Sequence, residues 1–152
     1  VSLRYFNVFG ERQGYNQYAG VISIFINRAL KGEPLIIYGD GKQTRDFIYV
    51  KDVVKANILA AESSKANGKV FNVARGERTT ILELALKIID ATNSPSSIIF
   101  DKPRPGDIRH SQADISEIRK LGFKPEYSLE EGLLKTVEWY RGELDEKNNP
   151  RP

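Results

Sequence analysis

Two arginines lie in loops from which their side chains could reach a negatively charged ligand. Arg45 follows a turn that contains Gly39 and Gly41, and Arg104 lies in the proline- and glycine-rich segment 102–107. A proline-containing loop loses little conformational entropy on binding, and guanidinium groups form forked, charge-assisted hydrogen bonds with phosphates. If the two side chains converge, the pair predicts a phosphate or pyrophosphate site. The alternative is that both are solvated surface arginines, because the sequence does not show that they converge.

Three polar residues could add to such a site, and each also has a structural interpretation. Asp107 could accept a hydrogen bond from a sugar hydroxyl, or it could cap a turn. Asn7 and Asn72 lie within apolar runs, where a buried amide must find hydrogen-bond partners. Asn7 could therefore contact a ligand or be satisfied within the protein, and for Asn72 we favour the structural role.

Several kinds of catalytic site are excluded by the residues that are present. Tyr38 and Lys42 have the spacing of a catalytic Tyr-x-x-x-Lys pair, but that pair needs a helix to share one face, and Gly39 and Gly41 predict a turn instead. No glycine-rich dinucleotide fingerprint follows a strand. The chain has no cysteine and one histidine, His110, which we interpret as a surface or capping residue. We therefore expect no metal site and no catalytic residue in this chain.

The composition is that of an ordinary globular domain. The chain has 152 residues and a net charge of +3, from 23 basic and 20 acidic residues, and this length suits one domain. The charges are interspersed, so we expect no nucleic-acid partner. No apolar span or signal peptide is visible, so we expect no membrane contact and a cytoplasmic location. The chain contains no methionine and opens on an apolar run, and we therefore expect a fragment of a longer protein.

Strand-like and helix-like segments alternate along the chain, which indicates the α/β class. Runs rich in β-branched and aromatic residues predict strands at 1–9, 35–38, 47–50, 69–74 and 97–100. Apolar residues at helical spacing predict helices at 21–30, 53–63, 81–91 and from 129 through 140. The runs 35–38 and 47–50 flank a glycine turn, which is typical of a hairpin. The strands at 3–9 and 70–74 are expected in one parallel sheet.

Four polar residues are placed to cap helices. Asp52 precedes the helix predicted at 53–63, and Thr80 precedes the next one. Asp114 and Ser128 each precede a glutamate by three residues, which is the spacing of a capping box. These positions predict where four helices begin.

Four motifs in order along the chain resemble a known family. They are LRYFNVFG at 3–10, GDG at 39–41 with RDFIYVKDV at 45–53, FNV at 71–73, and RPGD at 104–107. Together they resemble the C-terminal half of the extended short-chain dehydrogenase/reductases, and most of all the UDP-glucose and UDP-N-acetylglucosamine 4-epimerases. The resemblance covers residues 1–144.

The resemblance implies the substrate-binding part of an extended Rossmann-type fold, with a few strands of the parallel sheet and a small mixed α/β subdomain. Residues 1–75 would complete the sheet and supply a pocket insertion, residues 76–144 would bind the UDP-sugar, and residues 145–152 would be a disordered tail. The other half of the protein would hold most contacts to NAD and the catalytic Tyr-x-x-x-Lys, so this chain alone is expected to be inactive. Such enzymes are commonly homodimers.

The resemblance assigns nucleotide contacts to five residues. Arg45 and Arg104 are similar in position to the arginines that bind the diphosphate, and Asp107 to the residue that binds the ribose. Ile36 and Tyr38 match the strand beside the uracil. The resemblance therefore implies that the proposed anion site holds the diphosphate of a UDP-sugar.

Six further residues receive roles from the same resemblance. Asn7 resembles the family asparagine that contacts the sugar-nucleotide, and Val21 with Ile22 match backbone contacts at the start of the pocket helix. Tyr5 and Phe6 would lie close to the nicotinamide. Ser111 falls where family members carry either a tyrosine or a small residue, and the small form resembles enzymes that also accept N-acetylated sugars.

Two other interpretations stay open. A nucleotide-sugar dehydratase, decarboxylase or reductase of the same superfamily would share most of these motifs, although the triplets at 5–7 and 45–47 favour an epimerase. A protein of a different class, a non-enzymatic module that binds nucleotide-sugars or another protein, would need only the binding residues.

Overall fold

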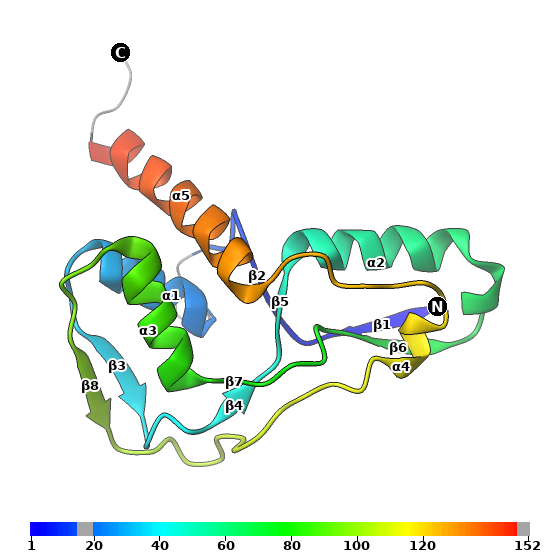
Figure 1. Cartoon of the computed structure of the whole chain (residues 1–152), viewed down its shortest axis with the longest axis horizontal. Helices are drawn as coiled ribbons and strands as arrows, with labels where there is room; N and C mark the ends of the chain where they lie inside the picture. The colour runs from blue at the N-terminus through cyan, green and yellow to red at the C-terminus, as the bar shows by residue number, and fades with distance from the viewer. Residues whose placement is uncertain (15–19, 149–152) are drawn as a thin grey trace.

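The structure is a computed structural model that describes residues 1–14 and 20–148 of the chain (Figure 1). Its strands are β1 (Ser2–Tyr5), β2 (Asn7–Phe9), β3 (Leu35–Tyr38), β4 (Thr44–Arg45), β5 (Phe47–Tyr49), β6 (Val70–Val73), β7 (Thr79–Thr80) and β8 (Ile98–Asp101). Its helices are α1 (Val21–Leu30), α2 (Val50–Glu62), the short 3₁₀ helix η1 (Ser64–Ala66), α3 (Ile81–Thr92), α4 (Ser116–Arg119) and α5 (Leu129–Asn148). The predicted α/β class is confirmed.

The strands form pairs, most of them parallel. β1 pairs with β6, β2 with β5 and β3 with β8, all parallel, whereas β4 and β7 are antiparallel. The parallel neighbours predicted at 3–9 and 70–74 are therefore confirmed for β1 and β6. The first predicted strand is divided at Phe6, because β1 and β2 pair with different partners.

The predicted hairpin between residues 35–38 and 47–50 is wrong. The turn itself exists, and Gly39 and Gly41 have φ angles of 84° and 74°, which glycine adopts without the cost that a Cβ brings. After this turn the chain leaves β3 and pairs elsewhere, since β8 is the partner of β3 and β2 is the partner of β5. An apolar run favours a strand but does not show which strand pairs with it. Here β3 and β5 each pair with a strand that is distant in the sequence.

Two of the predicted helix starts are confirmed, and two are wrong. Thr80 and Glu83 form a capping box at α3, and Ser128 forms the same reciprocal bonds at α5. Asp52 does not cap a helix, because α2 begins at Val50 and the Asp52 carboxylate is buried elsewhere. Asp114 accepts a hydrogen bond from the Ser116 amide, and no capping box forms at α4.

The core has two parts, which Figure 1 shows on either side of the β4–β7 pair. One part packs α1, α3 and α5 with β3 and the ends of β2 and β5, and the other packs α2 and α4 with β6. Both parts draw residues from either side of residue 75, so they do not divide the chain at the predicted domain boundary. The boundary itself stays a prediction.

The end of the chain differs from the prediction of a tail at 145–152. Helix α5 continues to Asn148, so residues 145–148 are helical, and residues 149–152 lie outside the described part. Within residues 1–14 and 20–148, no helix has both the length and the hydrophobicity needed to cross a membrane. The same residues bring together no group of histidines and carboxylates that could hold a metal ion.

Candidate functional site

A cavity of about 250 Å³ lies where α1, β3, β4 and the segment 102–112 meet, and it is called the arginine cavity below. Its apolar wall is formed by Val21, Phe25, Ile36, Ile37 and Ile81. Its polar side chains are Asn7, Tyr38, Gln43, Arg45, Arg104 and Asp107. An apolar wall that faces a few converging polar groups is the usual form of a small-ligand site, and this cavity is more polar than most such sites.

Arg45 is held in this cavity by the loop that faces it. Its Nη1 donates to the carbonyl oxygens of Thr44, at 2.8 Å, and of Ile108, and its Nη2 donates to the Asp107 carboxylate. Only 17% of the side chain is exposed. These three bonds leave two of the five N–H donors of a guanidinium, so an anion in the cavity could receive the other two.

Arg104 reaches the same cavity from the loop after β8. Its guanidinium carbon lies 3.9 Å from the centroid of the Tyr38 ring, within the distance of a cation–π contact. The parallel pairing of β3 with β8 produces this contact, because it brings Tyr38 opposite Asp101, three residues before Arg104. The prediction that Arg45 and Arg104 converge on one site is therefore supported by the geometry.

The segment that carries these groups is fixed at its other end to β4. The Thr44 amide donates to the Arg109 carbonyl at 2.9 Å, and the Ser111 amide donates to the Thr44 carbonyl at 3.1 Å. The His110 ring nitrogen Nδ1 lies 3.2 Å from the Thr44 hydroxyl. The loop and the strand thus form one wall, with His110 in the structural role that its sequence position favours.

An exposed ion pair closes the rim of the cavity wall. Arg109 donates to both carboxylate oxygens of Asp40, at 2.6 and 2.8 Å. These bonds, with a weaker contribution from the Lys42 amide, hold the pKa of the Asp40 carboxyl well below its usual range. The pair joins the glycine turn after β3 to the loop that contains Arg104.

The structure brings together seven of the nine substrate-binding residues predicted from the sequence. They are Asn7, Val21, Ile36, Tyr38, Arg45, Arg104 and Asp107, and Asp107 is also the ion-pair partner of Arg45.

Four predicted residues do not line the cavity. Ile22 is 2% exposed within the core, and Ser111 lies in the segment 102–112, bonded to β4, and does not line the cavity. Phe6 packs against the second part of the core. Tyr5 is half exposed and donates to Asn57 on α2 at 2.8 Å. The structural role favoured for Asn72 agrees with its bond to the Asp114 carbonyl.

Four lining residues were missed at the sequence level, namely Phe25, Ile37, Gln43 and Ile81. Three of them are apolar and belong to patterns that equally predict core residues. Gln43 carried a usable signal, since it lies two positions before Arg45 and alternate residues of an extended chain share a face. Its Nε2 donates to the Tyr38 carbonyl at 2.7 Å, so it joins two walls of the cavity.

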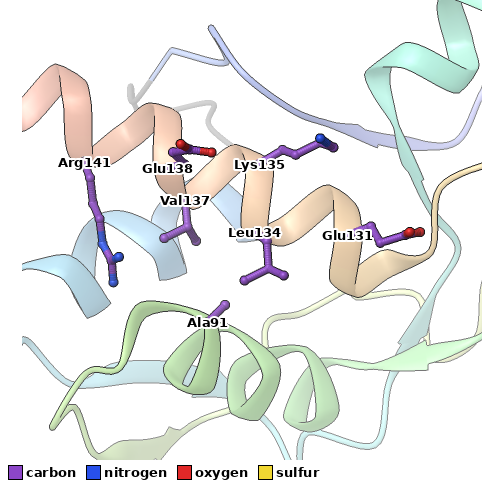
Figure 2. A pocket seen from close by; sticks show the side chains of 7 residues that line it. All are labelled: Ala91, Glu131, Leu134, Lys135, Val137, Glu138 and Arg141. Atoms are coloured by element: carbon purple, nitrogen blue, oxygen red, sulfur yellow. The ribbon is translucent and has the colours of Figure 1, made fainter.

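A larger cavity of about 610 Å³, the α3–α5 groove, has different chemistry. Figure 2 shows Leu134, Val137 and Arg141 pointing from α5 toward Ala91 on α3, while the Glu131 and Lys135 side chains point away from it. The groove's lining contains two acidic and two basic residues, and Arg141 is bound to the Thr92 carbonyl at 2.6 Å. No charge of one sign converges there, so the smaller arginine cavity is the candidate site.

Comparisons with known proteins point to one family. Residues 1–74 match the model of the NAD dependent epimerase/dehydratase family. The chain is 44% identical to a putative UDP-glucose 4-epimerase of Methanocaldococcus jannaschii, over 98% of this chain and 46% of that protein. It is 41% identical to a UDP-N-acetyl-alpha-D-glucosaminuronate decarboxylase of Bacillus cytotoxicus, over 91% of this chain and 45% of that protein.

A solved structure gives the same likeness. The UDP-N-acetylglucosamine 4-epimerase of Methanobrevibacter ruminantium M1, in complex with UDP-N-acetylmuramic acid, superposes with a TM-score of 0.87 at 50% identity. The superposition covers 93% of this chain and 46% of that one. The chain thus spans just under half the length of the relatives that it matches.

Proposed function

This chain belongs to the NAD-dependent epimerase/dehydratase family, and we propose that it is the nucleotide-sugar-binding portion of a UDP-sugar 4-epimerase. One observation carries the proposal: Arg45 and Arg104, which lie 59 positions apart in the sequence, line one cavity with the aromatic ring of Tyr38. A pair of guanidiniums beside an aromatic ring suits a ligand that joins a diphosphate to a base.

Each part of such a ligand has a proposed partner. The uracil lies against Tyr38 and Ile36, and the diphosphate receives the unused donors of Arg45 and the guanidinium of Arg104. Asp107 forms an ion pair with Arg45. When the ligand binds, one carboxylate oxygen leaves this ion pair and accepts a hydrogen bond from a ribose hydroxyl. Asn7 faces the sugar end of the cavity, with Val21 at the first turn of α1, whose N-terminal amides carry the positive end of the helix dipole.

The family whose model matches the chain is NAD-dependent, and bound NAD would supply reversible hydride transfer to and from the sugar. Few residues described here fit such a large dinucleotide, because the arginine cavity is far smaller than NAD requires and Tyr5 and Phe6 supply only aromatic surface. We therefore propose that most NAD contacts, and the Tyr-x-x-x-Lys pair, belong to a part of the full-length protein outside this chain. Purified residues 1–152 should show no epimerase activity and at most weak UDP-sugar binding. Turnover by them, or a micromolar dissociation constant measured by calorimetry, would contradict this.

The substrate range is proposed to include N-acetylated sugars. Ser111 does not line the arginine cavity, but it belongs to the segment that forms one wall, and its amide is fixed to β4. Its small side chain would leave room for an N-acetyl group where the sugar extends beyond the cavity. The full-length enzyme should epimerise UDP-N-acetylglucosamine as well as UDP-glucose. Failure to turn over the N-acetylated substrate, with UDP-glucose turned over, would reject this extension alone.

The decisive experiment incubates the full-length protein with UDP-glucose and NAD and identifies the products by chromatography and NMR. UDP-galactose is the expected product. A 4-keto-6-deoxy sugar would identify a dehydratase instead. The decarboxylase relative justifies a parallel assay with a UDP-uronic acid, in which carbon dioxide release would favour that second function. UDP binding without any turnover would favour a non-enzymatic module.

The cellular setting completes the proposal. We propose a cytoplasmic homodimer, because the family that the sequence resembles is commonly dimeric and two-fold dimers are the commonest assembly among soluble oligomers. Sedimentation of the full-length protein measures the assembly, and a monomer at micromolar concentration would reject it.

A further inference from the structure

The carboxylate of Asp46 is fully buried and is bonded only to backbone amides. Its Oδ1 accepts from the Arg75 amide at 3.0 Å, and its Oδ2 accepts from the amides of Gly76 and Ala113 at 3.0 and 3.1 Å. The residue is 0% exposed. Burial raises the pKa of the carboxyl, while the three amide donors oppose that change. Such a group is costly to bury unless it is hydrogen-bonded, so its position in the fold calls for an explanation.

The bonds of Asp46 join the segments that form the arginine cavity. Its own backbone carbonyl accepts from the amide and the side-chain Nδ2 of Asn7, at 3.2 and 3.1 Å. Ala113 ends the segment that carries Arg104 and begins the return into the core. Side chains alternate along an extended segment, so Arg45 faces the cavity while Asp46 points to the opposite side.

The bonds of Asp46 to the amides of Arg75 and Gly76 connect it to the side of the cavity that α3 forms. Arg75 and Gly76 form the turn that precedes β7, and β7 pairs with β4, in register Arg45 to Thr79. Helix α3 follows β7 directly, and its first residue, Ile81, lines the cavity. One carboxylate is therefore bonded to Ala113, which follows the loop wall, and to the turn that leads through β7 into α3, while Arg45 lies next to it in the sequence.

We propose that Asp46 is a positioning residue for this site, which holds the Arg104 loop and the β7 turn at a fixed distance from Arg45. This inference rests on the proposed function, in which the ligand is a UDP-sugar. The diphosphate of that ligand binds both arginines, so its binding depends on the distance between them. Without the carboxylate, the loop keeps its bonds to Thr44, but its return at Ala113 is released. The two guanidiniums then no longer meet one diphosphate with fixed geometry.

Asparagine is the informative replacement, because it has nearly the same shape and a different hydrogen-bond capacity. An amide side chain has one accepting oxygen and an NH₂ group that only donates. In Asp46→Asn, one oxygen still accepts, and the NH₂ group faces at least one backbone amide that needs an acceptor. A buried donor without a partner costs free energy, and the structure can relieve it by moving a tethered segment.

Asp52 offers a matched control. It is also 0% exposed, and it also accepts from backbone amides, those of Glu126 at 2.9 Å and Tyr127 at 3.3 Å. These partners lie in the connection before α5, and none of the three residues lines the arginine cavity. Asp52→Asn therefore makes the same chemical change at a place with no tie to the site.

The test measures UDP binding by calorimetry, and steady-state kinetics with UDP-glucose, on the full-length protein. Asp46→Asn should weaken UDP binding about tenfold to a hundredfold and raise KM more than it lowers kcat. Asp52→Asn should lower the melting temperature and leave the dissociation constant within about twofold of the wild type. Equal UDP affinity in folded Asp46→Asn and the wild type would overturn the inference, and so would equal losses in both variants.

A second measurement covers the case in which Asp46→Asn does not fold. Coupling is reciprocal, so if the Asp46 bonds favour UDP binding, UDP must strengthen them in the wild type. Saturating UDP should slow hydrogen exchange at the amides of Arg75, Gly76 and Ala113, and should leave Glu126 unchanged. Unchanged exchange at all three amides, with UDP bound, would reject the inference. A wild-type protein that does not bind UDP would reject the proposed function instead.

Discussion

The arginine cavity and the α3–α5 groove differ in volume, the property by which a ligand site is often chosen. The groove is the larger of the two, at about 610 Å³ against 250 Å³, and it displays Leu134 with 56% of its surface exposed. The arginine cavity has less space, but its polar groups come from four separate segments and converge. Volume alone would select the groove, whereas the guanidiniums of Arg45 and Arg104, which converge on one cavity, indicate an anionic ligand.

The two regions also differ in what holds them together. The arginine cavity is fixed by hydrogen bonds between distant segments, through Arg45, Gln43 and Asp46. The groove lies between helices that are fixed by apolar packing and by capping boxes at Thr80 and Ser128. Substitutions in the first region should therefore change binding more than stability, and those in the second should change stability alone.

The largest expected effect is on UDP binding, and it distinguishes the arginine cavity from the α3–α5 groove. Arg45→Met keeps the length of the side chain and removes its charge-assisted bonds, each of which contributes about 1.5–3 kcal/mol. We expect the dissociation constant for UDP to rise about a hundredfold or more, measured by calorimetry on the full-length protein. Leu134→Ser in the groove is the matched control and should leave the constant unchanged. Similar losses in both variants would mean that the groove, too, belongs to the ligand site.

The next effect separates buried from exposed positions within α5. A Cβ on Gly132 would lie 2.7 Å from the Phe9 ring and 3.2 Å from the Tyr49 Cβ, whereas a Cβ on Gly142 meets nothing within 4 Å. Gly142→Ala should stabilise the protein by about 0.5–1 kcal/mol through helix propensity. Gly132→Ala should destabilise it by about 1–3 kcal/mol, because overpacking outweighs the same gain.

Denaturant unfolding with UDP binding measured in parallel checks this pair. Both variants should bind UDP with the wild-type affinity, since neither position lines the arginine cavity. If Gly132→Ala proved more stable than the wild type, the close packing of α5 against Phe9 would be refuted.

A feature of the fold or the candidate site could be predicted when neighbouring residues in the sequence indicate it, and could not be predicted when it depends on distant segments. Arg45 and Arg104 were proposed for one site because a turn glycine and two prolines mark their loops. Thr80 was predicted as a cap because it precedes an apolar repeat, and Ser128 because Glu131 follows it at the spacing of a capping box. The partner of β3 was not predicted, because a run such as 35–38 carries no information about β8. The predicted hairpin was wrong for that reason.

The roles of the two buried aspartates also could not be predicted, because their partners are distant in the sequence. Asp52 was predicted to cap a helix, since aspartate before an apolar repeat usually does so, but its carboxylate accepts from amides more than seventy residues later. Asp46 drew no prediction at all, and only the fold brings Arg75, Gly76 and Ala113 to it. Contacts to two distant segments of the chain cannot be predicted from the aspartate or its neighbours in the sequence.

A smaller effect is expected at the cap of α5. The Ser128 hydroxyl accepts from the Glu131 amide at 3.1 Å, and the Glu131 carboxylate accepts from the Ser128 amide at 2.7 Å. Ser128→Ala removes the first bond and should cost about 1 kcal/mol of unfolding free energy, measured by denaturant unfolding. UDP affinity should not change. A loss of affinity would show that the groove and the arginine cavity are coupled through α5.

The smallest effect compares two exposed carboxyl groups, one from each region, whose pKa values are both lowered by different bonds. The pKa of Asp40 is lowered chiefly by the Arg109 side chain, and that of Glu131 chiefly by the Ser128 backbone amide. A lowered pKa means that each charged form stabilises the fold above the unfolded-state pKa of about 4, and that this contribution is lost as the pH falls through the folded-state value. In an NMR titration, Arg109→Gln should raise the pKa of Asp40 toward its usual range and leave Glu131 unchanged. High salt should likewise raise the pKa of Asp40 more, because screening weakens an exposed ion pair while the bond to a backbone amide remains. Equal responses of both groups to salt would show that Asp40 depends on the general field of the surface and not on its contact with Arg109.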